Sequence, residues 1–443
     1  MHLTEEQIIK LAPDAASEKA GKGLASPAKW VLREYSERAL WGHCQGSGKN
    51  PYQTQIDLQN IAFKCSCPSR KFPCKHGLGL LLLHASHPEL FHRTDEPEWV
   101  KTWLEKRSEN AEKKEKRAQE KANKPVDEKA RQRRVNERLR KVNDGVEELQ
   151  MRLKDILRNG LLNMPEKIYT LAPEMRRRLI DAQAPGLAAM VSELMKIDFE
   201  TEVWKYDLTD ALSRIYLLAE SYKNIDTLTP EWQEEIKSLI GFTQAKEEIL
   251  SGSPVTDTWM VLYVREEKQD KITVQYHWLY GKFSGYYALY LQFLAPGVVP
   301  EVTLLPGSFI SADMYFYPGV SSQRVLFKQH TVSQDIFAPR ACVSVAEVMA
   351  MFRETVTRNP FVTKMPVIIA HLRLTQQGNE LHAMDADKHT VPLYLTEKAR
   401  AQLLLITGGK PFSAFLFADA KRWNIKTIWV EQHYHILDNE DDE

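Results

Sequence analysis

The stretch Phe63-Lys-Cys-Ser-Cys-Pro-Ser-Arg-Lys-Phe-Pro-Cys-Lys-His-Gly77 decides how the N-terminal part of the chain folds. It places Cys65, Cys67, Cys74 and His76 in the spacing C-x-C, then six residues, then C-x-H. This spacing is typical of side chains that share one metal ion, because the intervening loop lets the two halves fold together. We therefore predict that these four side chains bind a single metal ion.

Zinc is the metal that this ligand set indicates. Three thiolates and one imidazole satisfy Zn²⁺ tetrahedrally in a closed structural site. A catalytic zinc usually keeps an open position and favours histidine and carboxylate ligands. A catalytic zinc and a cluster of core cysteines without metal are the alternatives to this interpretation. The sequence predicts one structural Zn²⁺ per chain.

Basic side chains surround the cysteine cluster. Lys64, Arg70, Lys71 and Lys75 lie within it or beside it, where they would offset the negative charge of three thiolates. Lysine and arginine also contact nucleic-acid phosphates electrostatically. These four residues are therefore the candidate nucleic-acid-binding residues, with a solvated basic surface as the alternative.

Short strands and a helix are predicted around the cluster. The patterns 39–45 and 53–58 are typical of strands, and the polar segment 46–51 joins them as a turn. A further strand over 61–65 leads into the cysteines, and the apolar run after His76 predicts a short helix to residue 85. The N-terminal region is therefore expected to be a ββα unit built around the metal.

The cluster resembles the SWIM-type zinc finger. Cys65, Cys67, Cys74, His76 and Gly77, followed by the leucine-rich run 78–83, match the pattern of that family. The resemblance extends over about residues 35–92. It implies zinc binding through those four ligands and, as a tendency of the class, binding of DNA or protein.

The layout of the whole chain resembles bacterial SWIM proteins that occur beside MoxR-type AAA+ ATPases and von Willebrand A-domain proteins. The shared layout is an N-terminal finger, a charged linker and a long C-terminal region. This resemblance implies an adaptor in an ATPase assembly, with an AAA+ ATPase or a von Willebrand A-domain protein as partner.

The segment 105–140 separates the finger from the rest of the chain. It consists almost entirely of charged residues, Gln, Ala and Asn, and it has essentially no apolar face. Such a segment buries too little surface to fold alone, so we expect a solvated helix or a disordered linker. Pro125 interrupts any single long helix.

Apolar periodicity changes along the remainder of the chain. From Val146 to Leu157, apolar residues recur at spacings of three and four, which predicts helices, and similar patterns continue to about residue 250. Beyond Pro254, aromatic and β-branched segments predict strands, with a hairpin turn at 266–270. Further strands are expected at 286–294, 324–328, 367–374, 381–384, 412–417 and 426–431, with helices at 343–357 and 396–405.

These patterns give an α+β multidomain fold: an N-terminal ββα zinc finger, a charged linker, a helical region and a mixed, mainly antiparallel C-terminal region. The corresponding divisions are 1–103, 104–143, 144–252 and 253–443. The sequence shows no internal repeat, and the acidic tail 439–443 is expected to be disordered.

Composition narrows the function. The 443 residues carry a formal net charge of zero, so nucleic-acid binding would have to use a local patch. The first ten residues lack the features of a signal peptide, and no apolar run is long enough to span a membrane, so we expect a cytoplasmic protein. No catalytic motif is recognised, so we expect no enzyme.

The first hypothesis is a zinc-binding adaptor that mediates protein–protein interaction. The alternative is a zinc-finger nucleic-acid-binding (DNA-binding) protein that uses the finger and the basic segment. An unrecognised enzyme in the C-terminal region is the third hypothesis.

Overall fold

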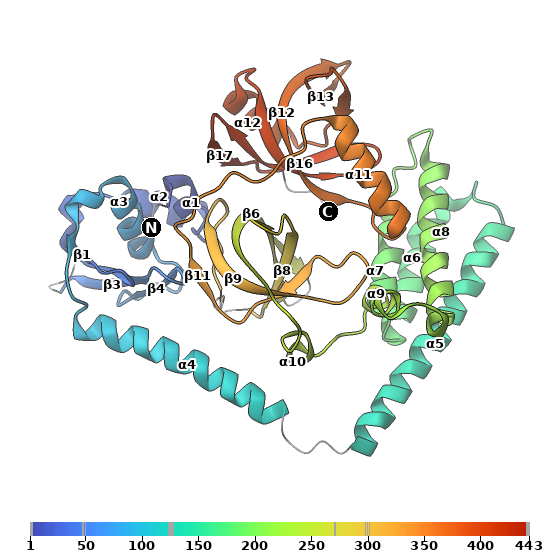
Figure 1. The fold of residues 1–443 in the computed structure, drawn as a ribbon, viewed down its shortest axis with the longest axis horizontal. Helices are drawn as coiled ribbons and strands as arrows, with labels where there is room; N and C mark the ends of the chain where they lie inside the picture. The colour runs from blue at the N-terminus through green and yellow to red at the C-terminus, as the bar shows by residue number, and fades with distance from the viewer. Residues whose placement is uncertain are drawn as a thin grey trace.

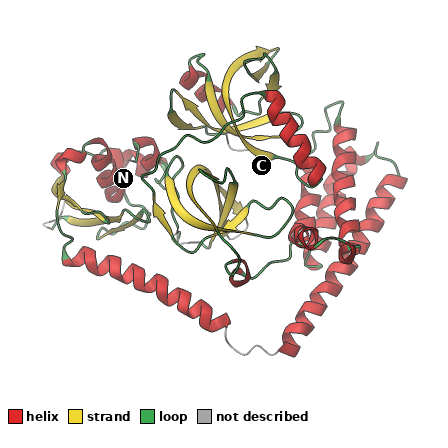
Figure 2. Cartoon of the chain, viewed as in Figure 1, coloured by secondary structure: helices red, strands yellow, loops and turns green. Residues whose placement is uncertain are grey.

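The computed structural model describes residues 3–46, 48, 50–122, 128–269, 272–296, 298, 300 and 302–439. Figure 1 shows an N-terminal unit on one side, a helical bundle on the other, and two β-barrels between and above them. Figure 2 shows that strands make up most of the barrels and that helices make up the bundle. This arrangement confirms the α+β multidomain fold expected from the sequence.

The N-terminal unit is a sheet covered on both faces. Its strands pair in the order β4-β3-β2-β1-β5. Helix α3 covers one face, where Leu40 and Ile56 are buried against its leucines, and α4 covers the other, where Trp41 is buried. Successive side chains of a strand point to opposite faces of the sheet. Because a helix covers each face, apolar side chains are buried on both of them. The elements are α1 (Glu5–Ile9), α2 (Ala15–Lys22), β1 (Trp30–Tyr35), β2 (Ala39–Cys44), β3 (Tyr52–Asp57), β4 (Ala62–Cys65), α3 (Lys75–Ser86), β5 (His92–Arg93) and α4 (Glu98–Ala122).

Two long helices connect this unit to the bundle. Helix α4 packs Val100, Trp103 and Leu104 on the sheet and then continues away from it. Helix α5 (Glu128–Arg158) leads into the bundle, and its apolar side chains are buried there from Val142 onward. Pro125, which was expected to interrupt the helix, lies outside the described residues. The divisions at 103, 143 and 252 remain predictions.

The bundle buries an apolar stripe from each of its helices. Val146, Leu149 and Leu153 of α5 face Ile168 and Met175 of the next helix, as the spacing of three and four requires. The last long helix begins with Pro230 in its first turn, which is the position where a missing N–H costs least. The bundle helices after α5 are α6 (Met164–Asp181), α7 (Pro185–Glu193), α8 (Trp204–Lys223) and α9 (Pro230–Ile240), and the short α10 (Lys246–Ile249) follows.

The first barrel follows the bundle. Its strands pair in the order β6-β7-β8-β10-β9, and β9 pairs back with β6. The short β10 pairs with β8 in parallel and with β9 antiparallel, which closes the sheet. The strands are β6 (Val255–Gln269), β7 (Ile272–Gly281), β8 (Tyr287–Leu294), β9 (Phe309–Phe316) and β10 (Arg324–Leu326). A further strand, β11 (His330–Val332), pairs antiparallel with residues 310–312 of β9, whereas β10 pairs with residues 315–316.

The second barrel is closed in the same way. Its strands pair in the order β14-β13-β12-β15-β16, and Leu393, directly after β14, bridges in parallel to Trp423 at the start of β16. The N–H of Tyr394 donates to the carbonyl oxygen of Trp423 at 2.8 Å. The elements are α11 (Val345–Arg358), β12 (Met365–Gln377), β13 (Glu380–Met384), β14 (Thr390–Pro392), α12 (Glu397–Thr407), β15 (Phe412–Ala418), β16 (Trp423–Val430) and β17 (His433–Ile436).

Both barrels have one connectivity. The first three strands of each form an antiparallel meander, and the third runs parallel to the fifth. The fourth strand pairs antiparallel with both the fifth and the first. In the second barrel a helix, α12, connects the third strand to the fourth. This is the connectivity of the OB fold. The sequence shows no repeat, so the repetition exists in the topology alone.

The outer faces of the two barrels pack together. Met260 and Leu262 of β6 contact the apolar side chains of Ile368 and Phe415 in the second barrel. The N–H of Ile368 donates to the Tyr287 hydroxyl oxygen at 2.9 Å, and the Tyr434 hydroxyl donates to the carbonyl oxygen of Leu262 at 2.7 Å. These strands are therefore apolar outside as well as inside the barrels.

Glu235 of α9 connects the bundle to both barrels. Its carboxylate accepts one hydrogen bond from the Val320 N–H at 3.1 Å and another from the Asn359 side-chain amide at 2.8 Å. Arg214 of α8 donates to the carbonyl oxygen of Pro360 at 3.0 Å. The bundle thus holds the segment that enters the first strand of the second barrel.

Two sequence-based expectations were wrong. The hairpin turn expected at 266–270 comes later, since β6 continues to Gln269 and pairs there with Ile272. The polar and charged residues 266–269 had indicated a turn, but they belong to the solvent-facing end of a long strand. Asn439, expected at the start of a disordered tail, is buried, and its side-chain amide donates to the carbonyl oxygens of Tyr394 and Ile425. Residues 440–443 lie outside the described residues.

No helix in the described part of the chain is long and apolar enough to cross a membrane.

Gly79→Ala tests the close packing of α3 on α2. A Cβ atom at Gly79 would lie 2.7 Å from the Leu24 Cβ and 3.1 Å from the Gly21 carbonyl oxygen. Backbone atoms cannot move aside cheaply, so we expect a loss of about 1–3 kcal/mol of unfolding free energy. Gly23→Ala is the control, because its new Cβ meets its nearest neighbours at 3.6 Å. Chemical denaturation measures both, and equal stability of the two variants would contradict the packing argument.

Candidate zinc site

Two neighbouring elements position the four side chains of the cysteine cluster. Strand β4 ends at Cys65, and Cys67 follows two residues later. Cys74 is the residue that caps the N-terminus of α3, and His76 lies in the first turn of that helix. The loop between them brings the end of the strand against the start of the helix.

The ligand atoms are close enough to share one ion. One donor atom from each of the four residues lies within 4.8 Å of every other. The Cys65 Sγ and the His76 Nδ1 are 3.7 Å apart. Zn–S and Zn–N bonds of usual length at a tetrahedral angle separate these atoms by about 3.6 Å. The distances and the donor set therefore fit one zinc ion.

Comparison with known families matches this region. Residues 52–85 match the family model of the SWIM zinc finger. Residues 52–85 are a SWIM zinc finger. Residues 137–240, from within α5 to the end of α9, match the SWIM-associated four-helix bundle domain. No curated protein matches the chain. The resemblance seen in the sequence is thus confirmed for the SWIM finger, and its Cys65, Cys67, Cys74 and His76 cluster is consistent with one structural zinc.

Proton affinities in the SWIM finger favour a thiolate at Cys74. Its pKa is lowered because the Cys65 thiol donates to its sulfur, and His76 and the Gly77 N–H stabilise the thiolate further. The same contact with Cys74, together with burial, raises the pKa of Cys65. A thiolate is the form of cysteine that binds metal. Of the two hydrogen-bonded thiols, Cys74 is therefore the one that loses its proton more readily.

Thr54 and Tyr52 support the ligands from the neighbouring strand. The Thr54 hydroxyl oxygen lies 3.2 Å from the Cys65 Sγ, and Thr54 itself is fully buried. The Tyr52 and His76 rings lie with their centroids 4.9 Å apart. Neither residue belongs to the spacing pattern that identifies the four ligands. The pairing of Thr54 with Cys65 in the β3–β4 hairpin could have revealed Thr54, once the hairpin register was assigned.

The zinc ligands fix α3 on the sheet. Gly77 allows the helix to approach the sheet closely, since a Cβ there would lie 2.7 Å from the Phe63 ring. The following leucines, 78 and 80–83, are all buried in the core of the N-terminal unit. Coordination at the first turn of α3 would therefore hold the helix that provides most of this core.

Other cysteines and histidines lie apart from this cluster. Burial raises the pKa of Cys44 and raises that of Cys342 to about 11, so both behave as inert core thiols. In the described part of the chain, no group of potential ligands includes either of them, nor His43, His84, His87, His92, His433 or His435. His84 instead contacts the rings of Tyr35 and Phe91.

Asp385, Asp387 and His389 form a second close group of potential ligands, in the turn after β13. The buried Asp385 carboxylate already accepts hydrogen bonds from the Val345 N–H at 2.8 Å and the His389 N–H at 2.9 Å. These contacts give Asp385 a structural role, because it caps the start of α11 and closes its own turn.

The candidate nucleic-acid-binding residues all lie on the surface of the SWIM finger. Lys64, Arg70, Lys71 and Lys75 are exposed. Lys71 forms an ion pair with Asp14, at 2.7 Å, and this contact lowers the pKa of Asp14 to about 2. One of the four charges is therefore already paired within the chain.

Cys74→Ser tests the zinc assignment. We expect about one zinc per wild-type chain and almost none in the variant, because Cys74 supplies one of four ligands in a closed site. Metal content is measured by mass spectrometry after chelator washing. Cys342→Ser is the control and should keep its zinc, since that thiol lies outside the cluster. Folded, metal-free wild-type protein would contradict the assignment.

Thr54→Val tests the hydroxyl next to Cys65. Removal of a partner that orients a metal ligand typically weakens metal binding, and we expect roughly a tenfold loss of zinc affinity. Competition with a chromogenic chelator measures it. Thr54→Ser keeps the hydroxyl and should bind like the wild type. Equal affinities of the valine and serine variants would exclude a role for the hydroxyl.

Proposed function

We propose that this protein is a zinc-binding adaptor that holds another protein on the surface of its helical bundle. The observation that supports this proposal best is a series of aromatic rings at one part of that surface. Tyr169 of α6 contacts Phe199, and Phe199 contacts Trp204 at the start of α8, with ring centroids 6.4 and 5.5 Å apart. We call these three residues the bundle aromatic patch.

Exposure of the patch supports a binding role. Tyr169 is 58% exposed, and Phe199 and Trp204 are half-buried against the bundle core. Next to the patch, Tyr206 is 78% exposed. Tyrosine and tryptophan are enriched among the residues that contribute most to protein–protein affinity. Apolar side chains left exposed together on a folded domain often mark an interaction site.

The SWIM finger has a structural part in this proposal. Its four ligands complete a tetrahedral site, which leaves no coordination position for a substrate. Zinc would then stabilise α3 and the sheet, and the protein would act by binding rather than by catalysis. This is the basis on which we propose that it is not an enzyme.

The proposed partner follows from the layout of the chain. SWIM proteins with this layout occur beside MoxR-type AAA+ ATPases and von Willebrand A-domain proteins, so we propose one of these as the protein held by the bundle. The bundle is a suitable surface because it is joined to the finger through α4 and α5 and to both barrels through Glu235.

Tyr169→Ala tests the adaptor. Purified full-length protein is titrated with a MoxR-type ATPase and, separately, with a von Willebrand A-domain protein from the same organism. We expect binding to one of them and a loss of about tenfold in affinity for the variant, since a buried interface aromatic contributes on the order of 1–2 kcal/mol or more. Tyr286→Ala, an exposed tyrosine on the first barrel, is the control. Unchanged affinity in Tyr169→Ala would remove the bundle aromatic patch from the interface.

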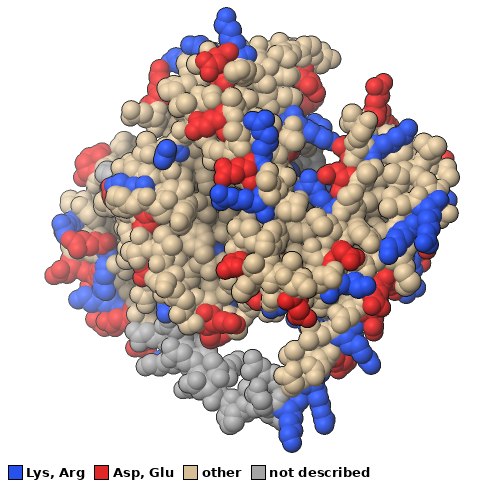
Figure 3. Space-filling view, turned by 45° about the vertical axis from the view of Figure 1, so that its right-hand side comes forward, with Lys and Arg blue, Asp and Glu red and all other residues tan. Residues whose placement is uncertain are grey.

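Nucleic-acid binding by the SWIM finger is the second candidate. The exposed Lys64, Arg70 and Lys75 favour it, because their charges remain available for phosphates. On the face of the molecule shown in Figure 3, which brings the bundle side forward, basic and acidic side chains are interspersed. The finger variants used below separate this candidate from a different nucleic-acid site.

A further inference from the structure

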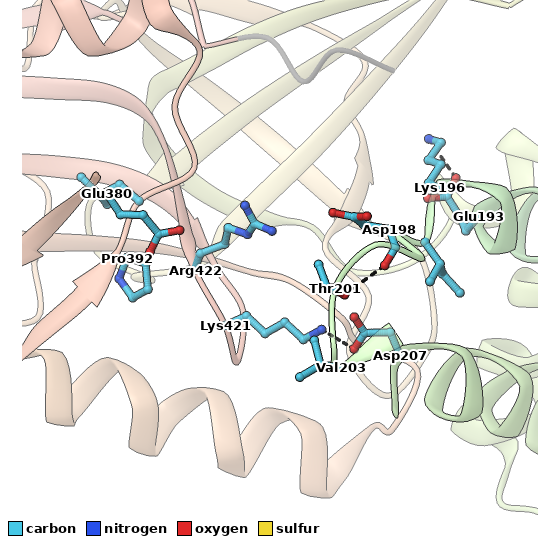
Figure 4. A pocket seen from close by; sticks show the side chains of 12 residues that line it. Glu193, Lys196, Asp198, Thr201, Val203, Asp207, Glu380, Pro392, Lys421 and Arg422 are labelled. Atoms are coloured by element: carbon cyan, nitrogen blue, oxygen red, sulfur yellow. Dashed lines mark hydrogen bonds and ion pairs between the residues drawn. The ribbon is translucent and has the colours of Figure 1, made fainter. Parts of the chain in front are cut away.

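A cavity of about 430 Å³ lies between the helical bundle and the second barrel. The bundle contributes the connection from α7 to α8, and the barrel contributes parts of β13, the end of β14 and the turn between β15 and β16 (Figure 4). The lining residues used below are Asp198, Asp207, Glu380, Leu393, Lys421 and Arg422.

The cavity occupies a particular place on the barrel. In OB-fold barrels, oligonucleotides and oligosaccharides bind across the second and third strands, next to the loops that join strands one to two and four to five. Glu380 begins the second strand, Leu393 directly follows the third, and Lys421 and Arg422 lie between the fourth and fifth. The cavity is thus found where barrels of this connectivity bind their ligands.

Two cations are presented there by a rigid turn. The Asp419 carboxylate accepts hydrogen bonds from the Lys421 N–H at 2.7 Å and the Arg422 N–H at 2.8 Å. Both side chains project toward the cavity in Figure 4, and both residues are exposed. The Arg422 guanidinium also lies over the Tyr394 ring, 5.6 Å from its centroid. A pair of cations side by side suits the phosphate backbone of a single strand.

Carboxylates of the bundle face these cations. Lys421 forms an ion pair with Asp207 of α8. Figure 4 shows Asp198 across the cavity from the Arg422 guanidinium. Asp198 lies in the connection between α7 and α8, where its carboxylate accepts a hydrogen bond from the Glu200 N–H at 3.0 Å. The acidic segment 198–207 therefore lies where an anionic ligand of the barrel would lie.

We propose that this face of the second barrel binds single-stranded nucleic acid, with Lys421 and Arg422 on its phosphates, and that the segment 198–207 covers the site until the strand displaces it. The inference does not depend on the adaptor proposal, although Phe199 and Trp204 of the bundle aromatic patch belong to the same segment. The Lys421 side chain is 58% exposed, and an ion pair this exposed contributes little stability, so a polyanion can replace Asp207.

The experiment measures fluorescence anisotropy of a labelled 15-nucleotide oligo-dT with the full-length protein at several salt concentrations. Lys421→Ala/Arg422→Ala should weaken binding at least tenfold and lower the salt slope by about 1.4, since each phosphate contact to a single strand contributes about 0.7. Asp198→Asn/Asp207→Asn should strengthen binding several-fold, because it removes the competing carboxylates. All four residues lie at the surface of a preformed turn or helix end, and circular dichroism checks that each variant is folded.

Lys64→Ala/Arg70→Ala on the SWIM finger is the matched control, since it also removes one lysine and one arginine. The proposal requires that this control bind like the wild type. It is overturned if the asparagine variant fails to bind oligo-dT at low salt, or if the two alanine pairs weaken binding equally. Loss of binding in the finger pair alone would also overturn it and would favour the finger as the nucleic-acid site. Tyr169 lies on α6, outside the segment 198–207, so the titration of Tyr169→Ala with the protein partner tests the adaptor proposal separately.

Discussion

Coordination of one ion by the end of β4 and the first turn of α3 is the constraint on which the N-terminal unit depends. Leucines 78 and 80–83 of α3 are all buried in the core on one face of its sheet. That core does not end at the finger, because Leu305 of the first barrel is buried in it and the Gln7 side chain donates to the Pro306 carbonyl oxygen at 2.7 Å. Coordination of zinc by four side chains of the finger therefore also affects the contact between the finger and the first barrel.

Barrel closure is the second constraint. Each barrel buries one face of its strands inside, and the packing of β6 against the second barrel also makes an outer face apolar. This contact fixes which side of the second barrel remains for other neighbours. The second and third strands of that barrel, with the β15–β16 turn, are left facing the bundle, and the bundle places carboxylates there. At the cavity the bundle and the second barrel thus meet through charged groups, whereas Trp232 of α9 packs on Phe361 elsewhere on the same surface and the two barrels meet through apolar groups.

Polar contacts across this meeting surface differ in burial. Glu235 accepts hydrogen bonds from groups of both barrels and is half-buried, so loss of its carboxylate would take this partner from the buried Asn359 amide. The Lys421–Asp207 pair is far more solvated and exchanges readily with water and salt. A structure with firm contacts at α9 and a weak one at the start of α8 can separate locally at the cavity without losing its overall arrangement.

The sequence by itself determined the zinc ligands, the helix that follows them and the division into helical and strand-rich halves. Each of these depends on residues close together in the chain: Cys65 to His76 form one short loop, and the stripe from Val146 to Leu157 lies on one helix. Thr54 was not found because its contact with Cys65 depends on strand register. The two barrels, and the cavity where Lys421 meets Asp207, were decided only by the tertiary structure. Their closure depends on pairings such as Leu393 with Trp423, and no local spacing encodes which distant strands will pair.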